Sequence, residues 1–374
     1  MKISERLSSI PVSGIRRMFD LVTPDSVNLG LGEPDMAPPR VAVEAMAEAA
    51  RQGHNRYCPS PGIPELREGI AGISHRYNPS LTMENVLVTP SGTSGLLAIT
   101  QALLDPGDEA LIPDPGFVLY EPHSLLAGAK PRRYRLSDGD FQPDIESIKS
   151  QISAKTKLIF VNNPSNPTGG TLSQESYRAL LDLAEDEDII IISDEVYDRL
   201  VYDGEHLSFA GDLDRALVVN GFSKTMAAPG WRIGYVLADE SIMPDLSKMS
   251  YHICASPNTP VQHGVLAALP ALDDYLDEVR SIFASRRRLI VDLINEIPGF
   301  SLEAPKGAFY AFPSYEQDIS SEDLAMKLVK AGLVCTPGSV FGPTGEGHLR
   351  FSYAASEDMI KRGMAILDQV AREI

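Results

Sequence analysis

One stretch of the sequence indicates the fold most directly: ALVVNGFSKTMAAPGWRIGY, residues 216–235. It begins with a continuous apolar run at 216–220, which is typical of a strand buried on both faces of a sheet. A loop of small residues follows and carries Lys224, and Arg232 comes eight residues later. A lysine among small residues at the mouth of a strand is desolvated, which lowers the pKa of its amine and makes the amine nucleophilic.

Similar strand patterns precede this stretch and alternate with helical patterns. The strand candidates lie at 86–89, 158–161 and 189–193, and the helical ones lie at 95–103 and 173–187. This alternation predicts an α/β domain with a mainly parallel sheet. Ligands bind beyond the carboxyl ends of the strands in such sheets, so the loops that follow the strands are the expected place for a site.

The last third of the chain has a different pattern. A long helical pattern at 275–296 is ended by a Pro-Gly pair, and short strands and two further helical patterns follow it. We therefore expect two domains: a large one over residues 36–274, and a smaller α+β domain that combines residues 1–35 with 275–374. The N-terminal segment has no strong strand pattern and is expected to lie against the small domain or a partner subunit.

The composition disfavours several classes of protein. Acidic residues outnumber basic ones by 51 to 33, and the formal net charge is −18, so nucleic acid is not an expected partner. No apolar stretch is long enough to span a bilayer, so no membrane is expected. The three cysteines are far apart and the seven histidines lack metal-ligand spacing, so neither disulfides nor a metal are expected. The start, MKISERLSSI, lacks the apolar core of a signal peptide, which predicts a cytoplasmic protein.

Four loops carry the residues that suggest chemistry. They are PSGTSG at 90–95, NPTGG at 166–170, SDEVYDRLVYD at 193–203, and the lysine loop quoted above. Each has an ordinary explanation: a helix start, a turn, a helix N-cap and a solvated lysine. Each also fits a ligand site. Small residues at the start of a helix leave room for a phosphate. Burial of a carboxylate at the end of an apolar strand, such as Asp194 after four isoleucines, is costly unless the carboxylate is paired.

Taken together, the motifs resemble those of the class I/II aminotransferases, the aspartate aminotransferase family of fold type I pyridoxal-phosphate enzymes. The motifs are LGEPD at 31–35, YCPSPGIPELR at 57–67, SGT at 91–93, PDPGFVLY at 113–120, NPTG at 166–169, SDEVY at 193–197, SK and GWRIGY within 223–235, PKGAFYAFP at 305–313 and HLRFSYA at 348–354. The likeness covers nearly the whole chain. It implies a large domain with a mainly parallel seven-stranded sheet between helices, plus a smaller α+β domain.

The resemblance implies a role for each residue that faces the cofactor. Lys224 would bind the aldehyde of pyridoxal 5'-phosphate covalently and would later move the proton at the substrate carbon. Asp194 would hold the protonated pyridine nitrogen, and Tyr197 would share the phenolic oxygen with Asn166. Phe117 would stack on the ring face.

The resemblance also implies a phosphate site and an active site shared between two subunits. The expected phosphate ligands are Ser91, Gly92, Thr93, Ser223 and Arg232. Tyr57 resembles the tyrosine that reaches the phosphate from the neighbouring subunit. A homodimer is therefore expected.

The substrate site implied by the resemblance centres on Arg350, which would bind the α-carboxylate together with Asn166 and the backbone of Gly32. Two positions depart from the family pattern. Gly221 stands where several relatives have a phosphate-binding serine, and Thr93 stands where some carry a lysine for the distal group of a dicarboxylate. The donor is left open between aspartate, an aromatic amino acid and alanine. The implied reaction is a ping-pong transfer of the amino group from an L-amino acid to a 2-oxo acid such as 2-oxoglutarate.

Two other functions fit parts of the pattern. A β-lyase, or another carbanion reaction on the same scaffold, would begin from the same bond cleavage, and stoichiometric transfer to an added oxo acid separates the two. An effector-sensing regulator domain would follow a basic DNA-binding segment. The match that begins at residue 31 and the acidic charge disfavour the regulator.

Overall fold

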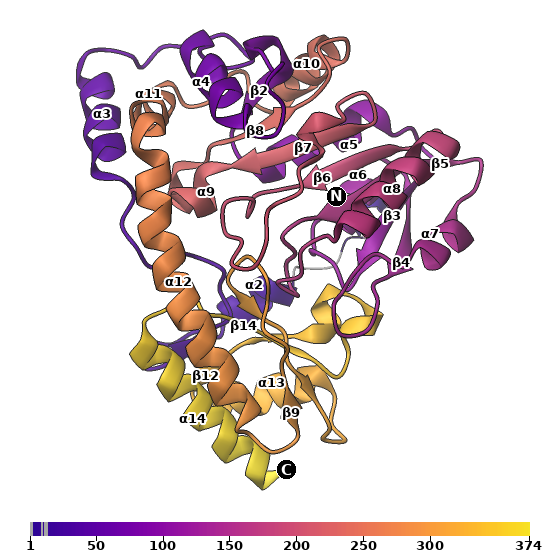
Figure 1. Cartoon of the computed structure of the whole chain (residues 1–374), viewed down its shortest axis with the longest axis vertical. Coiled ribbons are helices and arrows are strands. Elements are labelled where there is room, and N and C mark those ends of the chain that lie inside the picture. The colour runs from indigo at the N-terminus through magenta and orange to yellow at the C-terminus, as the bar shows by residue number, and fades with distance from the viewer. Residues whose placement is uncertain (1–2, 9, 11–13) are drawn as a thin grey trace.

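The computed structural model describes residues 3–8, 10 and 14–374. The chain forms a larger body around a sheet and a smaller body, and the long helix α12 (Leu272–Asn295) runs from one to the other (Figure 1). Leu276 of α12 belongs to the hydrophobic core around the sheet, whereas Phe283 belongs to the core of the smaller body. The helix therefore joins two cores, and the domain limits of the sequence analysis remain a prediction.

A seven-stranded sheet forms the centre of the larger body, in the order β2-β8-β7-β6-β5-β3-β4. β8 runs antiparallel to both of its neighbours, and every other pair in this sheet is parallel. The strands are β2 (Val86–Thr89), β3 (Glu109–Asp114), β4 (Lys130–Arg135), β5 (Thr156–Asn162), β6 (Ile190–Asp194), β7 (Ala216–Gly221) and β8 (Gly234–Leu237). The predicted mainly parallel, seven-stranded sheet is confirmed.

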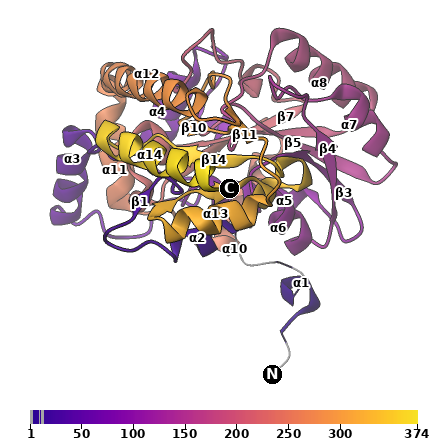
Figure 2. The ribbon, with the colours of Figure 1, turned by 90° about the horizontal axis from the view of Figure 1, so that it is seen from below.

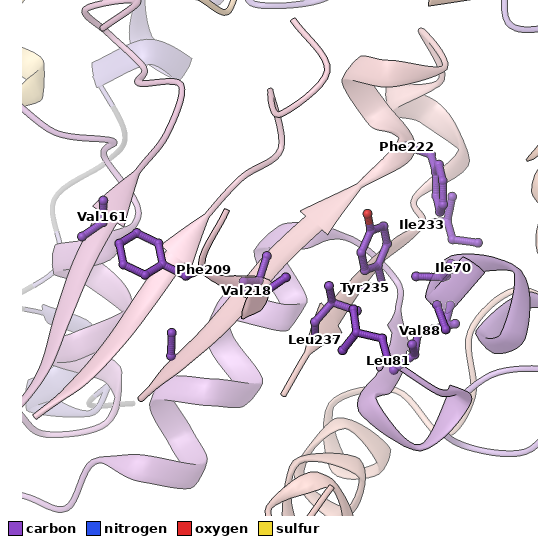
Figure 3. Packing of buried hydrophobic residues seen from close by; sticks show 14 of the residues in the cluster. Ile70, Leu81, Val88, Val161, Phe209, Val218, Phe222, Ile233, Tyr235 and Leu237 are labelled. Carbon is purple, nitrogen blue, oxygen red and sulfur yellow. The ribbon is translucent and has the colours of Figure 1, made fainter. Parts of the chain in front are cut away.

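Both faces of the sheet are buried, because successive residues of a strand point to opposite sides. In β7, Val218 belongs to one hydrophobic cluster and Val219 to another. Figure 3 shows part of the first cluster, in which Tyr235 and Leu237 of β8 lie between Val218 and Ile70 of α4 (Pro64–Ser74). Burial on two sides explains why these strands read as continuous apolar runs.

Helices cover the sheet and connect its strands. Besides α4, they are α3 (Arg40–Arg51), α5 (Gly92–Leu103), α6 (Tyr120–Leu126), α7 (Ile145–Gln151), α8 (Gln174–Asp186), α9 (Phe222–Thr225), α10 (Met243–Ile253) and α11 (Thr259–Ala268). Short 3-10 turns lie at Met83–Asn85, Phe209–Gly211, Pro229–Trp231, Leu269–Ala271, Gly338–Phe341 and Pro343–Gly345. The N-cap of α5 is Ser91, whose hydroxyl oxygen accepts a hydrogen bond from the Ser94 N–H at 3.0 Å.

The smaller body combines the C-terminal third with the N-terminal segment, because β1 (Val27–Asn28) pairs in parallel with β12 (Leu333–Val334). Its other elements are β9 (Phe300–Ser301), β10 (Tyr310–Ala311), β11 (Ser314–Tyr315), α13 (Ser321–Lys330), β13 (Thr336–Pro337), β14 (Leu349–Ser352) and α14 (Glu357–Glu373). Helix α2 (Gly14–Phe19) lies beside α13 (Figure 2), and α1 (Glu5–Ser8) precedes it. Among the helices in the described part of the chain, none has the length and apolar character needed to cross a bilayer.

Candidate active site

A cavity of about 240 Å³ lies beyond the carboxyl ends of the parallel strands, between the larger and smaller bodies. We call it the central cavity. It is lined by twelve of the thirteen predicted site residues: Gly32, Ser91, Gly92, Thr93, Phe117, Asn166, Asp194, Tyr197, Ser223, Lys224, Arg232 and Arg350. The exception is Tyr57, whose side chain is 88% exposed on the segment between α3 and α4. The fold therefore brings twelve residues from distant parts of the chain together around one cavity.

Lys224 lies on α9, the short helix that follows β7 directly. Its Nζ donates a hydrogen bond of 2.5 Å to the carbonyl oxygen of Gly32. Burial lowers the pKa of the amine to about 8, against an opposing effect of the Glu33 carboxylate, and the positive charges of Arg350 and Arg232 add to the lowering. The amine therefore has a much larger neutral fraction near neutral pH than an ordinary lysine, and the neutral form is the one that acts as a nucleophile or a base.

Asp194 is the last residue of β6 and is 3% exposed. Its Oδ2 accepts a hydrogen bond of 2.9 Å from the Tyr120 hydroxyl, whereas its buried Oδ1 has no hydrogen-bond partner within the described chain. Burial raises the pKa of the carboxyl to about 6, and the hydrogen bonds from Tyr120 and the Val196 N–H oppose this rise. A buried acceptor without a partner is costly and marks a place for a ligand donor.

The neighbouring carboxylate, Glu195, is not part of the cavity. Its Oε2 lies 2.9 Å from Nε2 of His206, and its Oε1 accepts hydrogen bonds from the Ser193 hydroxyl at 2.8 Å and the Phe209 N–H at 2.9 Å. Both carboxylate oxygens of Glu195 therefore have partners within the protein. The two consecutive acids therefore differ: Glu195 has an ionic partner, and Asp194 has none.

Two tyrosines lie beside Asp194 in the wall of the cavity. The hydroxyls of Tyr197 and Tyr310 are 2.7 Å apart, and both side chains are buried. Gly32 lies directly against this pair, because a Cβ added to Gly32 would stand 2.0 Å from the Tyr310 hydroxyl. A larger residue at Gly32 would therefore displace the Tyr310–Tyr197 contact.

The start of α5 provides an anion site. The N–H groups of Gly92 and Thr93, in its first turn, have no acceptor within the helix and carry the positive end of its dipole. Gly234 on β8 permits this placement, because a Cβ there would lie 2.5 Å from the Gly92 nitrogen. Arg232 stands at the mouth of the cavity in the left-handed conformation, with φ of 54°.

Arg350 lies on β14 and is 1% exposed. One guanidinium nitrogen donates to Asn166 Oδ1 at 2.9 Å, the other donates to the Gly30 carbonyl and to Thr336 Oγ1, and Nε has no partner within the described chain. The group lies 4.6 Å from the ring centroid of Tyr310 and 5.0 Å from that of Phe341. Burial lowers the pKa of this guanidinium from its ordinary value, and no carboxylate of the described chain pairs with it. A buried arginine of this kind fits the carboxylate of a ligand.

These features fit pyridoxal phosphate. The unpartnered Oδ1 of Asp194 fits a protonated ring nitrogen, the start of α5 with Arg232 fits a phosphate, and Lys224 supplies the amine for an aldehyde. Phe117 offers a flat apolar surface in the same cavity.

Two residues of the site were missed by the sequence analysis. Tyr120, which donates to Asp194, lies three residues after Phe117 in the quoted PDPGFVLY, and Tyr310 lies in the quoted PKGAFYAFP. Both motifs were recognised, but no spacing rule connects either tyrosine with its partner 74 or 113 residues away.

Comparisons with known proteins identify the family. The family described as aminotransferase class I and II matches residues 24–367. A probable aspartate aminotransferase of Methanocaldococcus jannaschii is 38% identical over 98% of this chain and 99% of its own length. An aromatic-amino-acid aminotransferase of Thermococcus litoralis is 33% identical over 100% of this chain and 99% of its own length. A solved alanine aminotransferase of Pyrococcus furiosus superposes with a TM-score of 0.93, at 34% identity, over all of both chains.

The matches confirm the predicted fold, the cofactor and amino-acid transamination as the activity. The chain belongs to the class I and II aminotransferases, enzymes that use pyridoxal phosphate to transfer amino groups.

Proposed function

We propose that Lys224, Asp194 and Arg350 carry the amino-group transfer, by a ping-pong reaction between an L-amino acid and a 2-oxo acid. The observation that supports this assignment is their shared lack of a charged partner. All three line the central cavity, and none forms an ion pair within the described chain. Because unpaired charges in such a setting are costly, a cofactor and a carboxylate substrate account for their retention.

Pyridoxal phosphate, when bound, supplies an aldehyde that accepts amines and a ring that takes up the electron pair released at the substrate carbon. Lys224 would hold the cofactor and, when released, would use the lone pair of Nζ to take the proton from the substrate Cα. The pKa of about 8 suits this task, because a base works best when its pKa lies near the working pH.

Asp194 would keep a proton on the ring nitrogen through its free Oδ1, and Tyr120 would hold the carboxylate in place through Oδ2. Tyr197, Asn166 and Phe117 would fix the orientation of the ring. The start of α5, with Ser91, Gly92 and Thr93, would bind the phosphate together with Ser223 and Arg232.

Arg350 would bind the α-carboxylate of the amino acid and of the oxo acid. Asn166 Oδ1 holds one guanidinium nitrogen, and Thr336 and the Gly30 carbonyl hold the other, so the fork is fixed before the substrate arrives. A fixed fork binds a carboxylate with little loss of side-chain entropy. The backbone of Gly32 would close the other side of the carboxylate.

We further propose that the enzyme acts as a cytoplasmic homodimer in which Tyr57 reaches the phosphate of the neighbouring subunit. The 88% exposure of this large aromatic side chain in the single chain supports a contact with another subunit. Relatives are named for aspartate, aromatic amino acids and alanine, and all three are candidate donors.

The proposal is tested on the purified protein with pyridoxal phosphate added. We expect a visible absorption band that bleaches with an amino-acid donor and returns with a 2-oxo acid, with the amino group recovered stoichiometrically. Lys224→Ala should lose the band and lower turnover at least about 10³-fold. Lys248→Ala, which changes an exposed lysine of α10, should keep both. A Lys224→Ala variant with normal absorption and turnover would refute the assignment.

A further inference from the structure

We infer that His206 is a positioning residue for the cofactor and acts through Asp194. Its positive charge, buried against Glu195, keeps Asp194 ionised and thereby keeps a proton on the ring nitrogen. This inference rests on the proposed function, because it concerns the carboxylate assigned to that nitrogen. It follows from three buried acids at the end of β6, from the histidine that contacts one of them, and from the way the backbone between two of them is held.

The three acids lie within five residues, at the point where β6 ends. They are Asp194, Glu195 and Asp198, and all three are buried. Asp194 lines the central cavity, and the side chain of Glu195 lies outside it. Burial is the main cause of the raised pKa of Asp194, and the negative charge of Glu195 adds to it. A positive charge beside Glu195 therefore helps Asp194 to stay ionised.

His206 supplies that charge. Its side chain is 4% exposed, and its Nε2 lies 2.9 Å from Oε2 of Glu195. Burial alone would lower the pKa of the imidazole, but the carboxylates of Glu195 and Asp198 outweigh burial and raise the pKa above its ordinary value. The imidazole is therefore protonated over a wider range of pH than that of an ordinary histidine.

Other charged or titratable groups surround this pair. They are Asp198 and Arg199 of the turn after β6, Tyr77 after α4, Tyr177 of α8, Asp212 after the 3-10 turn Phe209–Gly211, Tyr235 of β8 and Asp273 of α12. Burial raises the pKa of the three tyrosines, so their hydroxyls stay neutral. Arg199 forms an ion pair with Asp273, and Asp212 accepts a hydrogen bond from Tyr177. The cation in contact with Glu195 is thus His206.

The peptide group between Asp194 and Glu195 is held independently of the histidine. Its carbonyl oxygen accepts hydrogen bonds from the Asn162 side chain at 2.9 Å and from the Asn163 N–H at 3.0 Å. Its N–H donates to the Val219 carbonyl at 2.8 Å. Loss of the imidazole charge should therefore leave Asp194 in place and change its proton affinity.

The effect on the ring nitrogen follows from where the charges lie. Asp194 would share one proton with that nitrogen, and Glu195 lies on the side of Asp194 that faces away from the cavity. If the carboxylate of Glu195 has no cation beside it, the shared proton is drawn from the nitrogen onto Asp194, because it then lies nearer the negative charge. The ring would lose its positive charge and much of its capacity to take up the electron pair of the substrate.

The first experiment measures the charge of His206 in the cofactor-free protein by nitrogen NMR of its imidazole. The Tyr77 ring, whose centroid lies 5.5 Å from that of the imidazole, identifies the signal without a variant. We expect an imidazolium at pH 7, and Glu195→Gln should lower the pKa of the imidazole by about one unit or more. A His206 that is neutral at pH 7 in the wild type would overturn the inference, whatever the activity of the enzyme.

The second experiment follows the proton affinity of Asp194 in the cofactor-free protein. Asp194→Asn should gain stability over its parent as the pH rises toward the Asp194 pKa of about 6, and the gain should then level off. In a His206→Gln background the gain should continue to grow to about one pH unit higher or more. With Glu195→Gln added, it should level off near pH 6 again. Urea unfolding measures the gain, and an unchanged pH dependence in His206→Gln would refute the coupling.

The third experiment compares the loaded enzymes. His206→Gln should keep the cofactor band and lower kcat about 10-fold or more, as a shift of one pKa unit implies, with little change in KM. The double variant Glu195→Gln/His206→Gln should recover kcat to within about 3-fold of the wild type. This recovery separates charge from structure, because both variants lack the same imidazole. Equal impairment of the single and the double variant would mean that the charge of His206 is not what matters.

His75→Gln is the matched control, because it changes an exposed histidine at the end of α4 whose Nε2 lies 2.9 Å from the Leu81 carbonyl oxygen. It should match the wild type in all three measurements. A wild type with neither a cofactor band nor amino transfer would count against the proposed function, whereas the two measurements on the cofactor-free protein test His206 on their own.

Discussion

At the scale of single residues, the site is defined by charges that the protein does not neutralise. Asp194 has one oxygen without a partner, and Arg350 is buried without a carboxylate. The sequence predicted both positions because each lies in a motif whose order along the chain resembles a known family. It did not predict Tyr120 and Tyr310, because their contacts join residues that are far apart in the sequence.

The pKa of Asp194 gives a prediction for the protein without cofactor. Its rise from the ordinary 3.8 to about 6 corresponds to about 3 kcal/mol. Because the folded-state pKa is raised, this cost is absent below pH 4, grows as the pH rises toward 6, and is fully present above it. Asp194→Asn removes the charge and should stabilise the cofactor-free protein by about 1–3 kcal/mol at pH 8, and by less at pH 5.

Urea unfolding of the cofactor-free wild type and variant at the two pH values measures this difference. The same variant should lose turnover by about 10²-fold or more, because the ring nitrogen loses its anionic partner. A variant that is less stable at pH 8 than the wild type would show that the buried carboxylate has a partner after all.

At the scale of elements, strand ends and short helix starts set the positions of the reactive groups. The sequence predicted β2, β5, β6 and β7 because each is an apolar or β-branched run buried on both faces. It did not indicate β4, an edge strand with the sequence KPRRYR, because four of its six residues are charged and one is a proline. β3 contains a proline and β8 begins with a glycine, so neither has a clear strand signal.

The contact between β8 and α5 gives a prediction at this scale. In Gly234→Ala the new Cβ would stand 2.5 Å from the Gly92 nitrogen and 2.6 Å from the Ser91 carbonyl carbon, both backbone atoms. The first turn of α5 must therefore move. We expect a loss of about 1–3 kcal/mol in unfolding free energy and about 10-fold weaker binding of pyridoxal phosphate.

Gly230→Ala is the control for this experiment, because a Cβ at that position meets nothing within 4 Å. Fluorescence titration with the cofactor and thermal unfolding measure both quantities. Equal cofactor affinity in the two variants would mean that the first turn of α5 does not carry the phosphate.

At the scale of the whole molecule, the central cavity depends on both bodies. Asp194 and Lys224 come from the larger body, Arg350 and Tyr310 come from the smaller one, and Ile15 comes from the N-terminal segment. The sequence predicted the two bodies from the change of pattern after the sheet. It could not predict the volume of the cavity, because this depends on how the packed bodies meet.

The proposed homodimer leads to a complementation experiment. A mixture of Lys224→Ala and Tyr57→Ala chains, dissociated and reassociated at low cofactor concentration, should recover activity that neither variant has alone. In a mixed dimer, one site combines an intact Lys224 with an intact Tyr57 of the other chain. Random association should restore about a quarter of the sites.

Sedimentation of each variant controls for loss of the dimer itself. If the mixture remains as inactive as its components, Tyr57 does not act across subunits.

The unneutralised charges of Asp194 and Arg350 also bear on how long the protein persists in a cell. Until the cofactor and a carboxylate arrive, these groups favour opening of the region between the two bodies. Ligands that bind only the folded form lower the fraction of chains that proteases can attack. This fraction falls further as more of the binding sites are filled. Abundance of this enzyme should therefore follow the supply of its cofactor, with newly made chains degraded fastest when that supply is short.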